Sequence, residues 1–210
     1  EYISGTVPVD VLYTDKGDGT QSVEVKGDLT PARIYIEPFK FEKKTGEAGS
    51  VSAKASLANN VIKELNGVTL TSQNLSVNNA TIKFAPMNGK SADLSSGNLP
   101  DAKIGKTKMA VTFDVDKNNV MKVNAKGSVF DLAPFLDETE SSNMGIEAQA
   151  PIEKQQAMAI SMTADTMLAA NEQTIKGAKT YMETDTDGDI TRMEMDGDVG
   201  KGKLFVRFRP

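Results

Sequence analysis

The most distinctive spacing of side chains that could do chemistry lies in an acidic segment near the C-terminal end. Residues 183–194 can be aligned with a calcium-binding loop, in which oxygen ligands alternate around a sharp glycine turn. The residues that fit this pattern are Asp185, Asp187, Gly188, Asp189 and Glu194. Glu183 stands where such loops begin with Asp, and both flanks alternate like strands. An Asp-Gly hairpin turn without a metal therefore remains the competing interpretation.

Composition excludes several kinds of catalytic site. The 210 residues include no histidine and no cysteine, which removes zinc sites, cysteine nucleophiles and histidine-based triads. The carboxylate pair Glu138 and Glu140 lies in a polar run that reads as a solvated loop. Neither a glycine-rich phosphate loop nor a Gly-x-Ser-x-Gly turn is present. We therefore expect no enzyme activity and no cofactor.

The net charge of the chain argues against one class of binding partner. The formal net charge is -5 and the sequence pI is about 4.9, so nucleic acid is not an expected partner. The segment 201–209 alternates cations with Leu204, Val206 and Phe208. One interpretation is a cationic face for anionic lipid headgroups. The other is an edge strand that Lys and Arg protect against aggregation.

Alternation of apolar and polar residues, the pattern typical of strands, runs through most of the chain. Residues 108–115 form the clearest strand, 116–119 a hairpin turn and 120–127 the returning strand. The one good helix signal is Asp131 as N-cap with Pro134 in the first turn. The sequence predicts a mostly β fold: an elongated, twisted antiparallel sheet that forms an open groove, with one short helix near 131–140.

Three of the predicted strands carry thin apolar faces made of small residues and methionine. If these faces line one side of a single curved sheet, they form a smooth, adaptable surface suited to acyl chains. An ordinary sheet face covered by a helix or a second sheet is the alternative. The candidate lipid-contacting residues are Val51, Ala53, Ala55, Leu57, Met109, Val111, Phe113, Val115, Met158, Ile160 and Met162.

The sequence shows no stretch of roughly 18 apolar residues that could span a membrane, and no signal peptide. We expect a segment of a longer protein, with any targeting sequence outside it. The predicted organisation is one β unit over residues 1–136, a loop or linker over 137–150, and a further β unit over 151–210 that continues the same sheet.

Several segments resemble the AsmA-like domain family. Residues 27–36 (GDLTPARIYI) are similar to its "DLT-x-A" strand entry, and 39–46 (FKFEKKTG) to its "W-x-K-x-x-G" segment, with Phe41 in place of Trp. Residues 102–107 (AKIGKT) resemble the "L-x-x-x-x-x-G-x-T" entry, and 125–136 (AKGSVFDLAPFL) the "G-x-S-x-D-L-x-P-x-L" corner. The order of these segments carries the resemblance, which covers most of the chain from Val25 onward.

The resemblance implies a periplasmic protein of the bacterial envelope, anchored in the inner membrane and related to YhdP-like and TamB-like proteins. Its relatives have long β-grooves with an apolar interior and take part in phospholipid transport between membranes or in outer-membrane biogenesis. The expected partners are phospholipid acyl chains and other segments of the same parent protein. The alternative function is a structural or adhesive β module, and calcium binding through Asp185–Glu194 is one form of that alternative.

Overall fold

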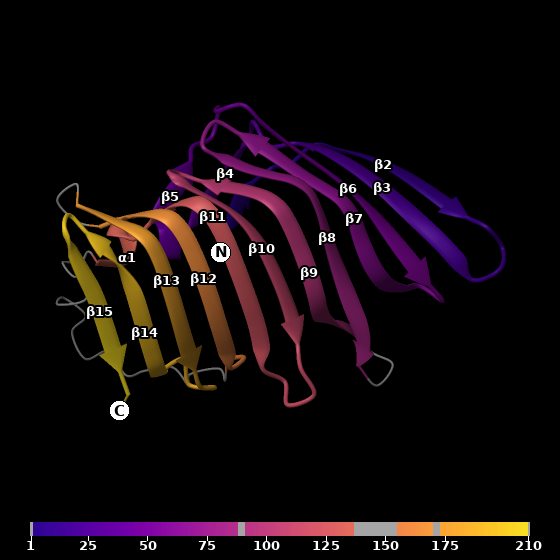
Figure 1. The fold of residues 1–210 in the computed structure, drawn as a ribbon. Helices are drawn as coiled ribbons and strands as arrows, with labels where there is room; N and C mark the ends of the chain where they lie inside the picture. The colour runs from indigo at the N-terminus through magenta and orange to yellow at the C-terminus, as the bar shows by residue number, and fades with distance from the viewer. Residues whose placement is uncertain (1, 88–90, 137–154, 170–172, 210) are drawn as a thin grey trace, which may run out of the picture. The chain divides into compact units, whose positions relative to one another are not determined.

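The chain folds almost entirely into strands. The computed structural model describes residues 2–87, 91–136, 155–169 and 173–209. Within these ranges, twelve strands belong to a largely antiparallel open sheet, three form a small separate sheet, and one short α-helix is present (Figure 1). The predicted mostly β fold with one short helix is thus confirmed. The chain divides into two compact units, Glu1–Asp114 and Val115–Pro210, and each is described separately.

The first unit contains seven strands of the large sheet. Their order is β2-β3-β6-β7-β8-β9-β10, and every neighbouring pair is antiparallel. The strands are β2 (Val9–Asp15), β3 (Thr20–Asp28), β6 (Gly49–Ala58), β7 (Val61–Ser72), β8 (Leu75–Met87), β9 (Ser91–Ile104) and β10 (Thr107–Val115). This order places strands that follow one another in sequence side by side, apart from the insertion between β3 and β6.

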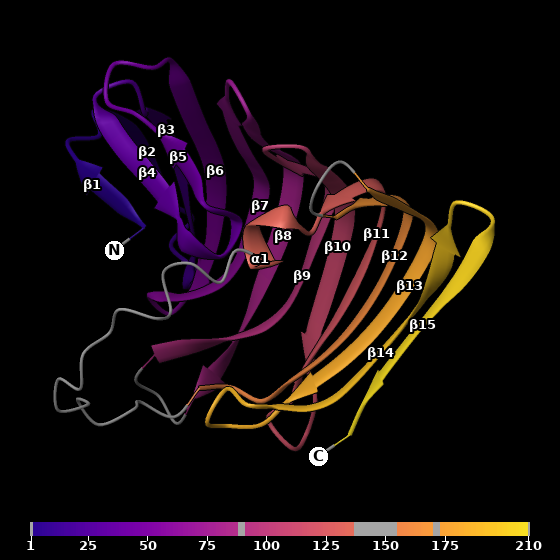
Figure 2. The same cartoon turned by 90° about the vertical axis from the view of Figure 1, so that its left-hand side faces the viewer.

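The insertion supplies β4 (Ala32–Ile36) and β5 (Phe41–Lys43) of the three-stranded sheet. Its third strand, β1 (Ile3–Gly5), precedes β2 in the chain, and the order is β1-β4-β5 (Figure 2). Buried Ile34 packs with Leu29 and Leu75, and half-buried Val51 and Leu70 lie against this cluster. The small sheet therefore covers part of one face of the large sheet in this unit.

Pro38 interrupts the chain between β4 and β5 of the small sheet. It lies in a single 3-10 turn, Glu37–Phe39, between β4 and β5, where Pro occupies one of the first helical positions. A proline is tolerated there because its missing N–H has no intrahelical acceptor. Lys40 ends the turn in the left-handed conformation, with φ of 44°.

The second unit contains β11 (Met121–Asp131), α1 (Ala133–Leu136), β12 (Met158–Leu168), β13 (Thr174–Thr184), β14 (Ile190–Val199) and β15 (Gly202–Phe208). β12 to β15 pair antiparallel in sequence order, but β11 and β12 are parallel. A parallel pair requires a long crossover, and here α1 begins it. The N–H of Ala133 donates to Oδ1 of Asp131 at 3.2 Å, as the capping pattern predicts.

Two predictions about the segment after β11 concern residues that the structure does not describe. The predicted loop over 137–150 and the last part of the helix predicted near 131–140 lie outside the described residues. The predicted boundary between β units after residue 136 stays a prediction.

The strands of the first unit are longer than the sequence indicates. Val68–Leu70, Leu75–Val77 and Ile82–Phe84 look like three short runs, yet they belong to the 12-residue β7 and the 13-residue β8. The register between these strands shifts on both sides of Val68. Such bulges break the two-residue alternation without ending the strand, because the backbone stays paired on either side.

Candidate functional site

One face of the first unit carries an unbroken apolar row across all seven strands of its large sheet. Each member lies directly opposite the next on the neighbouring strand, so their side chains share one face. This first apolar row consists of Tyr13, Val23, Ala55, Leu65, Ile82, Gly97 and Phe113. Sequence alternation shows which residues of one strand share a face, but only the register shows that the row is continuous.

A second apolar row crosses the same seven strands on the same face. It consists of Val9, Gly27, Val51, Leu70, Val77, Ala102 and Met109. Val51 and Leu70 of this row pack against the cluster that includes Ile34 of the three-stranded sheet. No member of the first apolar row is part of either buried core cluster in the described chain. The first apolar row is therefore the more accessible of the two.

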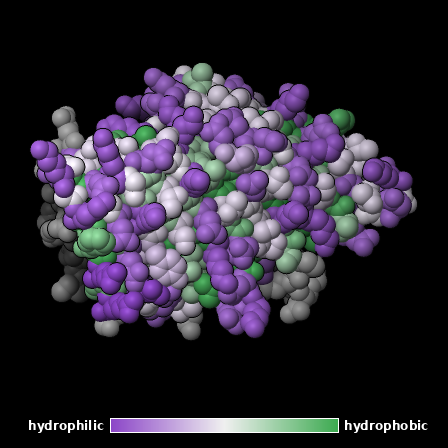
Figure 3. All heavy atoms as spheres, viewed as in Figure 1, coloured by the Kyte–Doolittle hydropathy of each residue, from purple (hydrophilic) through white to green (hydrophobic). Residues whose placement is uncertain are grey.

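The opposite face of the same strands is polar. A row with the same strand-to-strand pairing runs through Thr14, Ser22, Ser56, Glu64, Lys83, Ser96 and Asp114. Exposed cross-strand ion pairs add to it, such as Lys54 Nζ with Glu24 Oε1 at 2.7 Å. The space-filling view shows a surface dominated by hydrophilic residues, with apolar residues only in small patches (Figure 3). The sheet of the first unit thus separates an apolar face from a polar one.

The structure places most of the candidate residues where alternation predicts. Val51, Ala53, Ala55 and Leu57 alternate on β6, and Met109, Val111 and Phe113 share β10. A register shift interrupts β10 between Met109 and Val111, so Val111 pairs with Leu99. Val115 ends β10 but belongs to the second unit, as do Met158, Ile160 and Met162 on β12. That all eleven line one surface stays a prediction.

Sequence reasoning missed several members of the first apolar row, including Leu65 and Gly97. Leu65 lies in a segment whose apolar residues have helical spacing, so the sequence does not show which face of a strand its side chain is on. The pairing of β7 with β6 decides that face. Gly97 has no side chain, but it lies opposite Phe113 on β10. A Cβ at Gly97 would lie 2.3 Å from Cε1 of Phe113 and 2.4 Å from its Cζ, so the ring covers the glycine. A glycine within a strand is a general signal for such close approach.

The apolar face of the second unit is rich in methionine. One row runs through Val123, Ile160, Met182, Met193 and Phe208, and the next through Ala125, Met162, Thr180, Met195 and Val206. A buried cluster of Met167, Ile175, Ala178 and Met195 anchors this face at one end. Phe130 packs against the cluster, and Phe135 of α1 stacks on Phe130 with 5.7 Å between ring centroids. Unbranched thioether side chains make such a surface deformable.

Two hydroxyls interrupt this methionine-rich face. Oγ1 of Thr180 and Oγ1 of Thr184 are buried and have no hydrogen-bond partner among the described residues. Thr180 lies between Met162 and Met195 in the register. A buried hydroxyl without a partner costs about 1–3 kcal/mol of stability.

The acidic segment 183–194 comprises the end of β13, a hairpin turn over residues 185–189 and the start of β14. Oδ1 of Asp185 accepts hydrogen bonds from the N–H of Asp187 at 2.9 Å and of Asp189 at 3.0 Å. Oδ1 of Asp116 accepts from Asn118 at 2.8 Å and Val120 at 3.1 Å in the same way, although that turn has no calcium-like spacing. Those bonds hold the pKa of Asp116 below its usual value.

No group of three or more carboxylate, histidine or cysteine side chains converges on one point within the described part of the chain. The geometry at Asp185 therefore matches the hairpin interpretation, in which the carboxylate orders its own turn. Glu194, the proposed last calcium ligand, instead accepts hydrogen bonds from Arg209 at 2.9 Å and Arg192 at 3.0 Å. Arg209 and Arg192 lower the pKa of Glu194.

Two of the four cations of segment 201–209 form ion pairs within the unit. Besides Arg209 with Glu194, Lys203 forms an ion pair with Asp198 of β14. Arg207 lies directly opposite Glu194 in the register. These two ion pairs neutralise cations that a face binding anionic lipid headgroups would need. The arrangement therefore agrees better with an edge strand that basic residues protect against aggregation.

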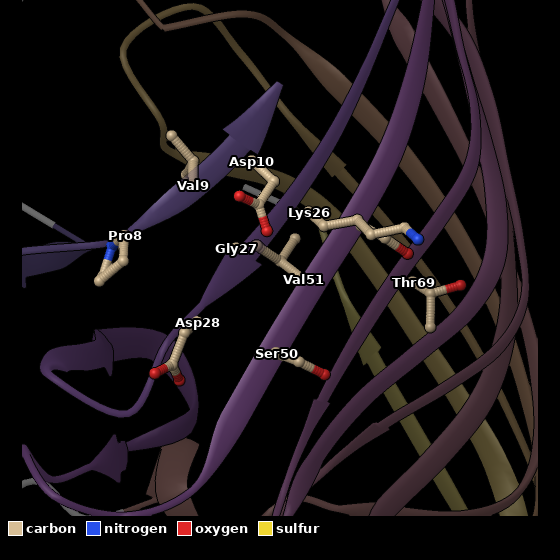
Figure 4. Close-up of a pocket in the computed structure, with 10 residues that line it drawn as sticks. Pro8, Val9, Asp10, Lys26, Gly27, Asp28, Ser50, Val51 and Thr69 are labelled. Carbon is tan, nitrogen blue, oxygen red and sulfur yellow. The ribbon is translucent and has the colours of Figure 1, made fainter. Parts of the chain in front are cut away.

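A shallow depression lies across β2, β3, β6 and β7 of the first unit (Figure 4). Its ionisable lining residues are Asp10, Lys26 and Asp28. Oδ1 of Asp28 accepts the N–H of Thr30 at 2.8 Å, and hydrogen bonds from the side chain and the backbone of Thr30 lower the pKa of Asp28. Asp28 therefore stabilises the turn that follows β3. Asp10 and Lys26 lie opposite each other in the register, an arrangement typical of a cross-strand charge pair.

Comparison of the chain with family models, with curated proteins and with solved structures found no match. Among the described residues, no helix combines the length and the hydrophobicity of a membrane span. The site must therefore be interpreted from its own geometry, which is an amphipathic sheet with many exposed apolar side chains.

Proposed function

We propose that this chain is a segment of an AsmA-like protein of the bacterial envelope and that its apolar sheet face holds phospholipid acyl chains. In this proposal the segment lies in the periplasm, its parent protein is anchored in the inner membrane, and the protein contributes to phospholipid transport between membranes or to outer-membrane biogenesis. The motif order from Val25 to the C-terminal end supports the family. The continuity of the first apolar row supports acyl chains as the ligand.

The first apolar row has suitable dimensions for this ligand. Seven strands at about 4.8 Å spacing extend over about 29 Å. The hydrocarbon core of a bilayer is about 30 Å thick and holds two leaflets, so one acyl chain needs about 15 Å. Each methylene removed from water contributes about 0.8 kcal/mol, so binding along the row requires no specific polar contact. The mainly aliphatic row from Val23 to Ile82 meets that requirement.

The proposal assigns a binding role and no catalysis. The described residues that could ionise on the apolar side are few, and the carboxylates discussed above order turns or pair with cations. Bound lipid would contact apolar side chains of many strands, each weakly. Selectivity among lipids would then depend more on chain length than on the headgroup.

Native mass spectrometry of the purified chain, with extraction of bound molecules, tests this proposal. We expect co-purified phospholipid in the wild type and an at least tenfold lower bound fraction in Val111→Asp, because the new charge lies on the apolar face beside Leu99. Thr112→Asp adds the same charge at the next, exposed residue of β10 and should retain lipid.

Circular dichroism melting of both variants shows whether they fold. Equal lipid loss in two folded variants, or no lipid in the wild type after exposure to phospholipid vesicles, would contradict the proposal. A melting temperature that rises with calcium in the lipid-free protein would favour the structural or adhesive β module instead.

A further inference from the structure

The outer strand of the first unit, β2, is an open sheet edge. It is the last strand in the order of the large sheet, and among the described residues its one partner strand is β3. All seven of its residues are exposed. Val9, Val11, Leu12 and Tyr13 are 55%, 59%, 60% and 56% exposed, which is unusual for four large hydrophobic residues within one short strand. Neither core cluster of the described chain includes any of them.

This edge lacks three of the usual protections against strand addition, although it carries the carboxylates of Asp10 and Asp15. Natural edge strands are blunted by bulges, prolines or lysines. The pairing of β2 with β3 runs without interruption from Val9 opposite Gly27 to Asp15 opposite Gln21. The sequence of β2, VDVLYTD, contains no proline and no lysine. A regular strand of this kind is a template for another strand.

The direction of the backbone hydrogen bonds identifies which residues would pair. The N–H of Asp28 donates to the carbonyl oxygen of Pro8 at 3.0 Å, and the N–H of Lys16 donates to that of Thr20 at 3.1 Å. Backbone groups alternate in direction along an antiparallel strand, so the even-numbered residues of β2 face β3. The odd-numbered residues, Val9, Val11, Tyr13 and Asp15, direct their N–H and C=O groups to the open edge.

We propose that a second copy of this chain binds at this edge, with β2 antiparallel to β2 around a two-fold axis at Leu12. Leu12 is the central residue of the seven-residue strand. In this register Leu12 lies opposite Leu12 of the second copy, Val11 opposite Tyr13, and Asp10 opposite Thr14. The odd-numbered residues of both copies form the new hydrogen bonds, and the apolar faces of the two first units become continuous.

The sequence of β2 favours this self-complementary register over the registers centred on Val11 and Asp10. An axis at Val11 would place each Leu12 opposite an Asp10, and an axis at Asp10 would place two carboxylates directly opposite each other, which is destabilising. The axis at Leu12 avoids both and pairs an aromatic with a β-branched residue, which is a favourable cross-strand pair. It also buries Leu12, an exposed leucine on the otherwise polar face. A two-fold interface of this kind closes after two copies.

Cysteine cross-linking tests the register, because the chain has no native cysteine. Under mild oxidation, Leu12→Cys should form a disulfide-linked dimer, since directly opposite residues have Cβ atoms about 4.5–5.5 Å apart. Thr14→Cys is the matched control on the same strand and face. Its counterpart in the second copy would be displaced by four residues, about 13 Å along the strand. We expect at least tenfold more dimer from Leu12→Cys than from Thr14→Cys.

Sedimentation equilibrium over a concentration series tests the interface itself. The wild type should move from 22.5 kDa toward twice that mass as concentration rises. Val11→Pro removes one edge-directed N–H without touching a hydrogen bond to β3, a position at which strands tolerate proline. It should stay at 22.5 kDa with an unchanged β-type circular dichroism spectrum.

Three results would overturn the inference. A wild type that stays monomeric at every concentration, or a dimer that folded Val11→Pro leaves intact, would exclude the β2 edge. Equal cross-linking of Leu12→Cys and Thr14→Cys would exclude the register. None of these measurements involves lipid, so their results test the β2 interface independently of the proposed lipid-binding function.

Discussion

Replacing Gly97 with alanine is expected to destabilise the first unit by about 2 kcal/mol, within the range for overpacking. In an ordinary strand position this substitution would be favourable by about 0.5–1 kcal/mol, because glycine loses more backbone entropy on folding. Here the added Cβ would lie 2.3 Å from Cε1 of Phe113, and the ring has to leave its position over the glycine. Urea unfolding followed by circular dichroism measures the change.

The clash with Phe113 can be separated from other effects by a double-mutant cycle. In a Phe113→Ala background the space above Gly97 is free, so adding Gly97→Ala should be neutral or stabilising. The effect of the same substitution thus changes sign with one neighbouring side chain. If Gly97→Ala costs the same stability in both backgrounds, the ring does not lie over the glycine and the first apolar row is not continuous at β9.

Replacing Lys43 with alanine is expected to lower the free energy of unfolding by about 3 kcal/mol. Lys43 is fully buried, with 0% exposure, between the small sheet and the large one. Its Nζ donates to the carbonyl oxygens of Leu29 at 2.7 Å and Ala32 at 2.9 Å. Truncation removes these buried hydrogen bonds, although the carbonyl oxygen of Leu29 still accepts the N–H of Ala32 at 3.0 Å, and it opens a cavity beside Gly49.

Lys43→Met is the matched control, because it keeps most of the side-chain volume and removes only the donor. It should cost less than Lys43→Ala, and the difference measures the packing of the aliphatic part of the side chain. Hydrogen exchange should show the loss first at the turn from Leu29 to Ala32, which connects the two sheets. A Lys43→Ala variant as stable as the wild type would show that the amine is not buried there.

The hairpins could be predicted because their turn chemistry is local. The turns at Asp116 and Asp185 begin with an aspartate whose side chain accepts the N–H groups of its own turn. Asn59 and Asn60, with φ of 51° and 63°, close the hairpin between β6 and β7 in the left-handed conformation that asparagine tolerates. The sequence does not predict this turn, because residues 58–66 are ambiguous between helix and strand. Each of these signals lies within a few residues of the turn that it forms.

The long strands and the parallel pair could not be predicted in the same way. Shifts in register around Val68 and between Lys83 and Phe84 depend on the neighbouring strand as much as on the residues themselves. The parallel pairing of β11 with β12 is decided by contacts between residues more than 30 positions apart, such as Met121 with Met158. Turn chemistry and alternation carry no information about such pairs.

The candidate site shows the same division. Alternation was sufficient to place Ala55 and Phe113 on apolar faces of their own strands. It could not show that Ala55, Leu65 and Ile82 lie in one line, because that line passes through two bulged pairs of strands. Nor could it identify Gly97, whose contribution to the surface is the space that it leaves for the Phe113 ring.

The most direct test of the lipid-binding account uses tryptophan as a probe, because the chain contains none. Phe113→Trp places the indole in the first apolar row, and Thr112→Trp places it at the next, exposed residue of β10. Fluorescence is measured with phospholipid brominated in its acyl chains, which quenches only tryptophan in contact with them. The account predicts strong quenching of Phe113→Trp and little of Thr112→Trp. Equal quenching of the two, or none in either, would contradict it.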